Sequence, residues 1–380
     1  MESIKGMKLN KGEWAEFYVF LKLLGDGKLY TADNLLKKNW KNYLDILSII
    51  RQEISDVIEY VVDGNAKKIT IESKSTTLAT ISMQEFENHS KTLFDNLKNS
   101  KGNSIPAPAS ICDFAKIIYV TKPKAPAVKA LEKEFGGKND IIVKVRDSQT
   151  AIVSVMGFSI KSKFASNPTL FNASASSPFL YKVENCDDGK MKEFNNIFDE
   201  NGHREWKRCK NYFKAQNMSL SYKQNRNSTF DNNLFLVGES MGKILAWCAE
   251  DRLFFSESDF EVKETVERMI AKNPLSIPNP KIYYEKVAKD LLIATFTGMT
   301  AAKEWDGREQ VNGGYIVVME DGDVLCYHSS DREAFRDYLY RNTHFEYVDS
   351  KKFKWSYIEK IGNEYFIPLN ISIRFNTKTR

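Results

Sequence analysis

Two neighbouring β-strand patterns in the middle of the chain constrain its fold more than any other feature. Residues 140–146 and 151–161 are rich in isoleucine and valine, and Asp147 opens the short polar run between them. Aspartate favours turns because its side chain accepts hydrogen bonds from backbone N–H groups further along the chain. The sequence therefore predicts an antiparallel hairpin that turns close to residue 150.

The charged residues of this hairpin are predicted to gather at its open end. Antiparallel pairing about that turn sets position 140 opposite about position 160, so Asp140 comes beside Ser159 and Lys161. Side chains alternate along a strand, so Ser159 and Lys161 share one face while Phe158 and Ile160 take the other. An ammonium is costly to bury without a partner. We therefore expect Lys161 at the end of the strand, across from Asp140.

Helical and strand patterns alternate along the rest of the chain. Residues 12–27 carry the apolar stripe of a helix, and residues 34–56 repeat the helical pattern. Residues 57–73 and 313–328 have the pattern of hairpins with Asp-Gly turns, and residues 82–99 suit a further helix. Helices mixed with mostly antiparallel hairpins indicate the α/β class in its mixed α+β form.

Length and composition indicate a globular, cytoplasmic protein. The 380 residues suffice for two lobes, although one elaborated domain is an alternative. No apolar run reaches the roughly 18 residues of a membrane span, and the N-terminus has no apolar signal segment. The five cysteines are scattered, as expected of free thiols in a reducing compartment. A formal charge of +5 permits a polyanionic partner without requiring one.

The spacing of Asp140 and Lys161 is similar to that of the PD-(D/E)xK nucleases. There the first acid binds Mg²⁺, which prefers hard oxygen ligands, and the lysine orients or activates the attacking water. Metal and lysine together stabilise the charge that develops at phosphorus. In this chain Ser159 stands where a second acid is expected, so one ligand is missing. The alternative is a surface Asp–Lys pair that contributes little to stability.

A carboxylate in the first predicted helix is the candidate for the missing ligand. Many nucleases of this kind take a glutamate from an N-terminal helix, often four residues after a glycine, and Glu16 has that spacing. Glu13 is the weaker candidate on the same helix. We therefore predict a Mg²⁺ site formed by Glu16 and Asp140, with Lys161 as a catalytic residue and Ser159 as a hydrogen-bonding neighbour.

The longer pattern around these residues resembles the HpaII family of type II restriction endonucleases. The resemblance rests on seven blocks in the same order, covering nearly the whole chain, at residues 10–33, 138–145, 157–162, 169–174, 298–307, 313–328 and 369–375. It implies a Mg²⁺-dependent endonuclease that cuts both strands of a short DNA site, with a CCGG-like site as the expectation because the namesake cuts within C-C-G-G. A PD-(D/E)xK-like core, with a mixed central sheet flanked by helices, and a protecting methyltransferase as functional partner are also implied.

The resemblance extends to individual site residues. Asp140 and Lys161 match the nuclease motif directly, Glu16 matches by its place in the first helix, and Ser159 fills the usual place of an acid. The motif GFSIKS, residues 157–162, is met unchanged in this chain.

A basic segment with interleaved aromatic residues is the candidate for contacts to the DNA backbone. Residues 203–226 carry seven lysines and arginines against one glutamate. Among them we expect Lys207, Arg208, Lys210 and Lys214 to neutralise phosphates. A solvated helix face is the alternative.

Three further residues near the predicted metal site are candidate DNA contacts. Lys163 follows the catalytic strand directly and could reach a neighbouring phosphate. Thr169 and Asn172 lie in a loop-like stretch and could read bases or grip the cleaved strand. Equally, the polar residues of this stretch could cap the next element.

These features suggest two regions, with the boundary left open. We predict a PD-(D/E)xK-like catalytic region over residues 1–200 and a basic region of helices and hairpins over residues 201–380 that contributes DNA binding. Double-stranded DNA is the expected partner, and a homodimer would suit cutting of two strands, although monomers stay possible. A repair or structure-specific nuclease, and a DNA-binding protein without catalysis, are the alternative functions.

Overall fold

The computed structural model describes most of the chain, and its contacts divide the chain into two compact units. The first unit contains Met1–Pro168 and Gln310–Phe335, and the second contains Thr169–Glu309 and Arg336–Arg380. The predicted boundary at residue 200 therefore falls inside the second unit. The described residues are 8–33, 37–54, 56–102, 104–124, 128, 139–162, 169–200, 202, 204–255, 260–308, 314–328, 332–348 and 353–376.

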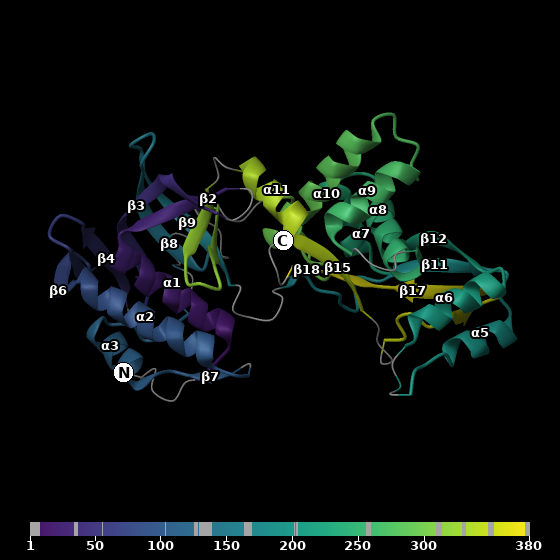
Figure 1. Cartoon of the computed structure of the whole chain (residues 1–380), viewed down its shortest axis with the longest axis horizontal. Helices are drawn as coiled ribbons and strands as arrows, with labels where there is room; N and C mark the ends of the chain where they lie inside the picture. The colour runs from purple at the N-terminus through teal and green to yellow at the C-terminus, as the bar shows by residue number, and fades with distance from the viewer. Residues whose placement is uncertain are drawn as a thin grey trace. The chain divides into compact units, whose positions relative to one another are not determined.

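The first unit is built on a nine-stranded sheet (Figure 1). A further pairing of β2 with β3 closes the strands from β2 to β3 into a ring. The two-stranded pair of β1 (Lys8–Leu9) and β7 (Ile105–Pro106) is separate from this sheet. The strand order in the large sheet is β2 (Lys28–Ala32), β14 (Val324–His328), β13 (Gly314–Val318), β9 (Val153–Ser162), β8 (Ile141–Asp147), β3 (Lys38–Gln52), β4 (Val57–Asp63), β5 (Lys68–Ser73) and β6 (Thr76–Ser82).

Helices α1 (Lys11–Asp26) and α2 (Met83–Asn99) lie side by side over this sheet, with α3 (Ala109–Ile117) next to α2 (Figure 1). The two long helices approach closely at Gly25, where an added Cβ would lie 2.8 Å from the backbone nitrogen of Glu87. Buried aromatic and aliphatic side chains of α1 form one core with the inner face of the sheet. The predicted helices over residues 12–27 and 82–99 are confirmed.

Both ends of α1 have the local signals that the sequence favours. At the start, Asn10 Oδ1 accepts from the backbone N–H of Glu13, and the Glu13 carboxylate accepts from the backbone N–H of Asn10. This reciprocal capping box satisfies two N–H groups that the first turn leaves without helical partners. At the end, Gly27 has φ 67°, a left-handed conformation that glycine adopts without steric cost.

The predicted helix over residues 34–56 is wrong, because Lys38–Gln52 form strand β3. Apolar residues there occur in pairs, and such spacing fits a helical stripe as well as a strand with a register shift. The structure has that shift between Ile46 and Ser48 on the β8 side. Because β3 pairs with β2, β4 and β8, its backbone groups are satisfied by neighbouring strands, which outweighs the helical preference.

The predicted hairpin over residues 140–161 is confirmed as β8 and β9. Ile141 pairs with Phe158 and Arg146 with Val153, in antiparallel register. Asp147 Oδ1 accepts from the backbone N–H groups of Gln149 and Thr150, which is the turn role expected for it. The hairpins predicted at residues 57–73 and 313–328 are likewise present, as β4–β5 and β13–β14.

The second unit combines two small antiparallel sheets with a set of helices (Figure 1). One sheet has the order β12 (Ser219–Asn225), β11 (Phe179–Glu184), β17 (Glu364–Leu369) and β16 (Glu359–Ile361), and the other has β10 (Thr169–Phe171), β18 (Ile371–Phe375) and β15 (Thr343–Tyr347). The helices are α5 (Asp188–Asn195), α6 (Trp206–Ala215), α7 (Ser228–Val237), α8 (Met241–Glu250), a π-helical turn (Asp251–Phe255), α9 (Val262–Lys272) and α10 (Pro280–Phe296). The division between units falls within α11 (Arg332–Asn342).

The architecture confirms the predicted mixed α+β class. In the part of the chain that is described, no helix has the length and apolar character needed to cross a membrane.

Candidate active site

Asp140 precedes β8 and is held by the neighbouring strand β9. Its Oδ2 accepts from Ser159 Oγ at 3.0 Å and from the backbone N–H of Ile160 at 2.7 Å. Its own backbone N–H donates to the carbonyl of Phe158 at 2.9 Å. One carboxylate oxygen is therefore fixed from the β9 side, and Oδ1 is the oxygen that lies near the Lys124 ammonium, at 4.0 Å.

Glu16 comes to the same place from the first turns of α1. Its Oε1 lies 3.0 Å from Lys124 Nζ, and its side chain is only 12% exposed. Its Oε2 is buried and has no hydrogen-bond partner among the described residues. The pKa of Glu16 is raised to about 7, first by burial and then by the Asp140 carboxylate, while the Lys124 ammonium opposes this rise.

The structure thus brings Glu16 and Asp140 beside a lysine, Lys124, that sequence reasoning missed, while Ser159 contacts the other carboxylate oxygen of Asp140. Glu16 Oε1 and Asp140 Oδ1 both contact Lys124 Nζ, so the two oxygens lie no further apart than the sum of these two contacts. The only sequence signal for Lys124 is its place in a Pro/Lys-rich segment, 108 positions from Glu16 in the chain.

Glu13 and Lys161 take different positions relative to this cluster. The Glu13 carboxylate accepts from the Asn10 backbone at 3.0 Å in the capping box, so helix capping already accounts for this weaker candidate. Lys161 lies in β9 two residues beyond Ser159 and beside Val317 of β13. Strand alternation places its side chain on the Ser159 face, and it is half-buried, whereas Phe158 and Ile160 are in the apolar core.

The donor set suits a hard divalent cation with few protein ligands. Carboxylates are the oxygen ligands that Mg²⁺ prefers, and Mg²⁺ commonly keeps several waters beside one or two of them. The buried Oε2 of Glu16, which has no hydrogen-bond partner among the described residues, is the kind of atom that a cation would satisfy. No group of three or more His, Cys, Asp and Glu side chains suited to a metal occurs in the described residues. Glu16 and Asp140 are the two carboxylates that approach Lys124 at this place.

The predicted phosphate-contacting lysines and arginine lie on α6 in the second unit. Lys207, Arg208 and Lys214 are exposed, and Lys210 is half-buried. Lys207, Lys210 and Lys214 share one helix face because they are spaced by three and four residues. Arg208 is partly engaged, by Glu205 at 3.4 Å and the carbonyl of Phe198 at 3.3 Å.

Several other members of the basic segment have structural roles. Arg204 is buried, and its guanidinium donates to the carbonyls of Asn195 and Ser356 at 3.1 and 2.9 Å. Trp206 packs edge-on against Tyr347 with ring centroids 4.6 Å apart. A positive charge and an aromatic ring in this segment are therefore used for packing, which the composition of the segment alone does not reveal.

The remaining candidate contacts follow β9 in the chain. Thr169 begins β10, pairs with Arg374 and is half-buried, and Asn172 is exposed after that strand. The nearby Ser174 closes a turn, since its Oγ accepts from the backbone N–H of Ser176. Lys163 lies outside the described residues.

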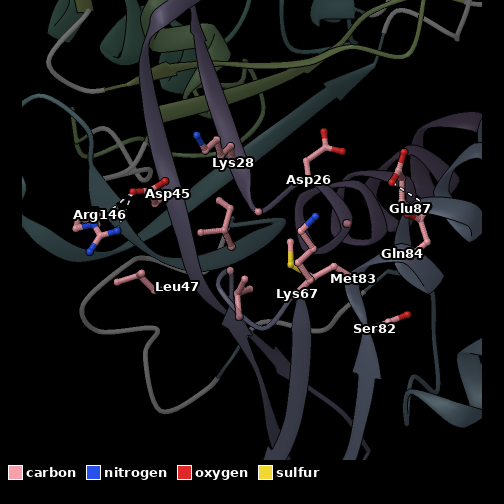
Figure 2. Close-up of a pocket in the computed structure, with 15 residues that line it drawn as sticks. Asp26, Lys28, Asp45, Leu47, Lys67, Ser82, Met83, Gln84, Glu87 and Arg146 are labelled. Atoms are coloured by element: carbon pink, nitrogen blue, oxygen red, sulfur yellow. Dashed lines mark hydrogen bonds and ion pairs between the residues drawn. The ribbon is translucent and has the colours of Figure 1, made fainter.

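A separate hollow in the first unit contains none of the predicted site residues. Figure 2 shows this pocket, of about 450 Å³, between the end of α1, the start of α2 and strand β3. Its acids are already paired: Asp26 with Lys22, Asp45 with Arg146, and Glu87 with Lys91. Arg146 lies near the end of β8 remote from Asp140, so this pocket and the carboxylate pair are at different ends of the strand.

Comparison of the sequence with known proteins relates this chain to one family. Residues 10–375 match the family described as HpaII restriction endonuclease. The chain is also similar to the type II restriction enzyme HpaII of Haemophilus parainfluenzae, with 33% identity over 368 residues that cover 96% of this chain and 98% of that protein. No solved structure matches the chain.

Proposed function

Because the chain belongs to the HpaII restriction endonuclease family, we propose that it hydrolyses both strands of duplex DNA at a short specific site, with Mg²⁺ as cofactor. A CCGG-like sequence is the proposed target, by similarity to the family's namesake. We propose that the protein acts in the cytoplasm, as a homodimer, alongside a methyltransferase that protects host DNA. The observation that carries the proposal is that the carboxylates of Glu16 and Asp140 both approach Lys124 Nζ. This pair of acids occurs in a chain whose family consists of nucleases.

In this mechanism Glu16 and Asp140 would hold Mg²⁺. When bound, the ion supplies Lewis-acid stabilisation of negative charge at phosphorus. Ser159 and the Ile160 backbone keep Asp140 in one orientation, so its remaining oxygen is already aimed before DNA arrives. The PD-(D/E)xK-like core is part of this proposal, with Ser159 in the place of its second acid.

Lys161 is the proposed partner of the attacking water. From the Ser159 face of β9, its ammonium would hydrogen-bond the water and offset charge on the phosphoryl oxygens. A lysine at this position is useful to catalysis because the stabilised charge is greatest in the transition state, not in the bound substrate.

Contacts to DNA are assigned to both units. On α6, the side chains of Lys207, Arg208, Lys210 and Lys214 would neutralise backbone phosphates without reading sequence. In the same proposal Thr169, Asn172 and Lys163, which follow the catalytic strand in the chain, contact the cleaved strand or its bases.

Substitution of the two motif residues tests the proposal. Asp140→Ala and Lys161→Ala should each lower plasmid cleavage in Mg²⁺ by at least about 10³-fold and leave DNA binding in Ca²⁺ nearly unchanged. Lys144→Ala is the matched control, because this exposed lysine lies on β8 and is not part of the proposed site. Cleavage at defined positions supports a restriction enzyme, whereas cutting restricted to flaps or lesions would favour a repair nuclease.

A DNA-binding protein without catalysis is the second candidate, and Ser159 in the place of an acid is the observation that favours it. It predicts that the parent protein binds DNA but leaves supercoiled plasmid intact in Mg²⁺ and in Mn²⁺. Any cleavage that Asp140→Ala abolishes would exclude this candidate.

A further inference from the structure

We propose that Lys124 is a positioning residue whose ammonium acts as an internal counter-ion for Glu16 and Asp140, and that a divalent cation must displace it on binding. The inference rests on the proposed function, because it takes these two carboxylates as the metal ligands. It adds that a cation of the protein itself, the Lys124 ammonium, competes with the metal ion for the two carboxylates.

The contacts of Lys124 place its charge where a metal ion would have to sit. Its Nζ lies 3.0 Å from Glu16 Oε1 and 4.0 Å from Asp140 Oδ1. The other oxygen of Asp140 is taken by Ser159 and the Ile160 backbone, so the lysine faces the oxygen that remains for a ligand. An ammonium and a divalent cation repel each other strongly at such distances, so both cannot occupy the space between these oxygens.

The backbone before Lys124 is anchored to the core. Thr121 donates from its backbone N–H to Glu53 Oε2 at 2.8 Å, and Arg51 Nη2 donates to the carbonyl of Lys122 at 2.7 Å. Arg51 and Glu53 are both buried and paired with each other at 3.0 Å. The buried ion pair of Arg51 and Glu53 therefore holds this segment in place next to the two carboxylates.

The side chain of Lys124 is nevertheless able to leave. It is 55% exposed, in contrast to 12% for Glu16, so its ammonium can turn into water when a cation takes its place. A flexible four-carbon stem makes that movement inexpensive. In the absence of metal, the same ammonium offsets the repulsion between two carboxylates held close together.

The test compares metal binding by the full-length parent and two variants without DNA. Lys124→Met keeps most of the stem and removes the charge, whereas Lys124→Arg keeps a charge. Each protein is titrated with Mn²⁺, and electron paramagnetic resonance measures the concentration of free Mn²⁺. The Kd for Mn²⁺ should be about 5- to 30-fold lower for K124M than for the parent. K124R should stay within about threefold of the parent.

A thermal measurement gives a second readout that does not depend on cleavage. Without metal, K124M should melt about 2–5 °C below the parent, and saturating Mn²⁺ should raise the melting temperature of K124M more than that of the parent. Lys144→Met is the matched control, because it removes an exposed lysine of the same unit that is not part of the carboxylate cluster, and it should change neither quantity.

The outcomes separate this inference from the proposed function. An unchanged or higher Kd for K124M, with a parent that cleaves DNA in Mg²⁺, would overturn the role of Lys124 alone. A Kd equally lowered in K124M and K144M would also overturn it, since general charge would then be the cause. If neither the parent nor K124M binds Mn²⁺, both the metal site and the displacement of Lys124 are wrong.

Discussion

At the scale of single residues, the two carboxylates of the candidate site differ in how they are held. Asp140 receives two hydrogen bonds on one oxygen, which fix its direction. Glu16 is largely desolvated, and its pKa of about 7 reflects burial next to a second acid. In the proposed mechanism Ser159, in the place of a motif acid, orients Asp140 and does not bind the metal ion. A serine at this position is therefore consistent with catalysis.

A half-buried glutamate in the second unit, Glu250, makes the stability of the protein depend on pH. Burial raises the pKa of Glu250 to about 7, the adjacent Asp251 adds to the rise, and Lys272 opposes it. A carboxyl group whose folded pKa is raised favours folding below its unfolded pKa of 4.5, and this contribution is lost as the pH rises through 7.

Glu250→Gln should therefore stabilise the protein at high pH only. We expect an increase of about 1 to 2 kcal/mol in the free energy of unfolding at pH 8, and no increase near pH 3, where both states are protonated. Denaturant unfolding of parent and variant at the two pH values measures this difference. Glu304→Gln, at an exposed position of the same unit, is the control, and an equal gain at both pH values would contradict the prediction.

At the scale of elements, α6 carries the charge that the proposed DNA contacts need. Lys207→Ala combined with Lys214→Ala removes two exposed charges from one helix face without touching the buried residues of α6. We expect DNA affinity in Ca²⁺ to fall about 10- to 100-fold at moderate salt, for specific and random DNA alike, because phosphates are common to both.

The dependence of that binding on salt gives the sharper measurement. Loss of two phosphate contacts should reduce the slope of log K against log salt concentration by about 2. Lys281→Ala, an exposed lysine on α10, removes a charge of the same kind and should leave the slope within about 0.5 of the parent. A double variant with parent-like slope would place the backbone contacts elsewhere than α6.

At the scale of the whole molecule, each chain offers one Glu16–Asp140 pair among its described residues, and a double-strand cut needs two hydrolyses. Two copies on a two-fold DNA site would provide both. If the active form is such a dimer, parent protein mixed with a tenfold excess of Asp140→Ala should produce mainly nicked plasmid, because nearly all dimers that contain a parent chain then hold one active site.

Gel separation of supercoiled, nicked and linear plasmid over time checks this. The same excess of Lys144→Ala should leave the linear product dominant, which controls for protein concentration. Linear product as the main species in the Asp140→Ala mixture would show that one chain cuts both strands in turn.

Much of the first unit could be predicted because its signals are local in the chain. Alternating apolar residues around Asp147 predict the register of β8 and β9, and that register brings Asp140 beside Ser159. The helix α1 follows from its apolar stripe, and Asn10, Glu13 and Gly27 supply its caps. Such features depend on backbone geometry and on neighbours a few residues away, so the sequence by itself determines them.

Other features were decided only by tertiary structure, because they depend on partners far away in the chain. The residues of β3 have a pattern that suits a helix, but they form a strand because they pair with three other strands. Lys124 reaches Glu16 across 108 positions of sequence, and Arg204 is buried by Ser356 from 152 positions away. A charged side chain has no periodic signal for its partner, so its role as counter-ion, buried anchor or exposed contact follows only once the chain has folded.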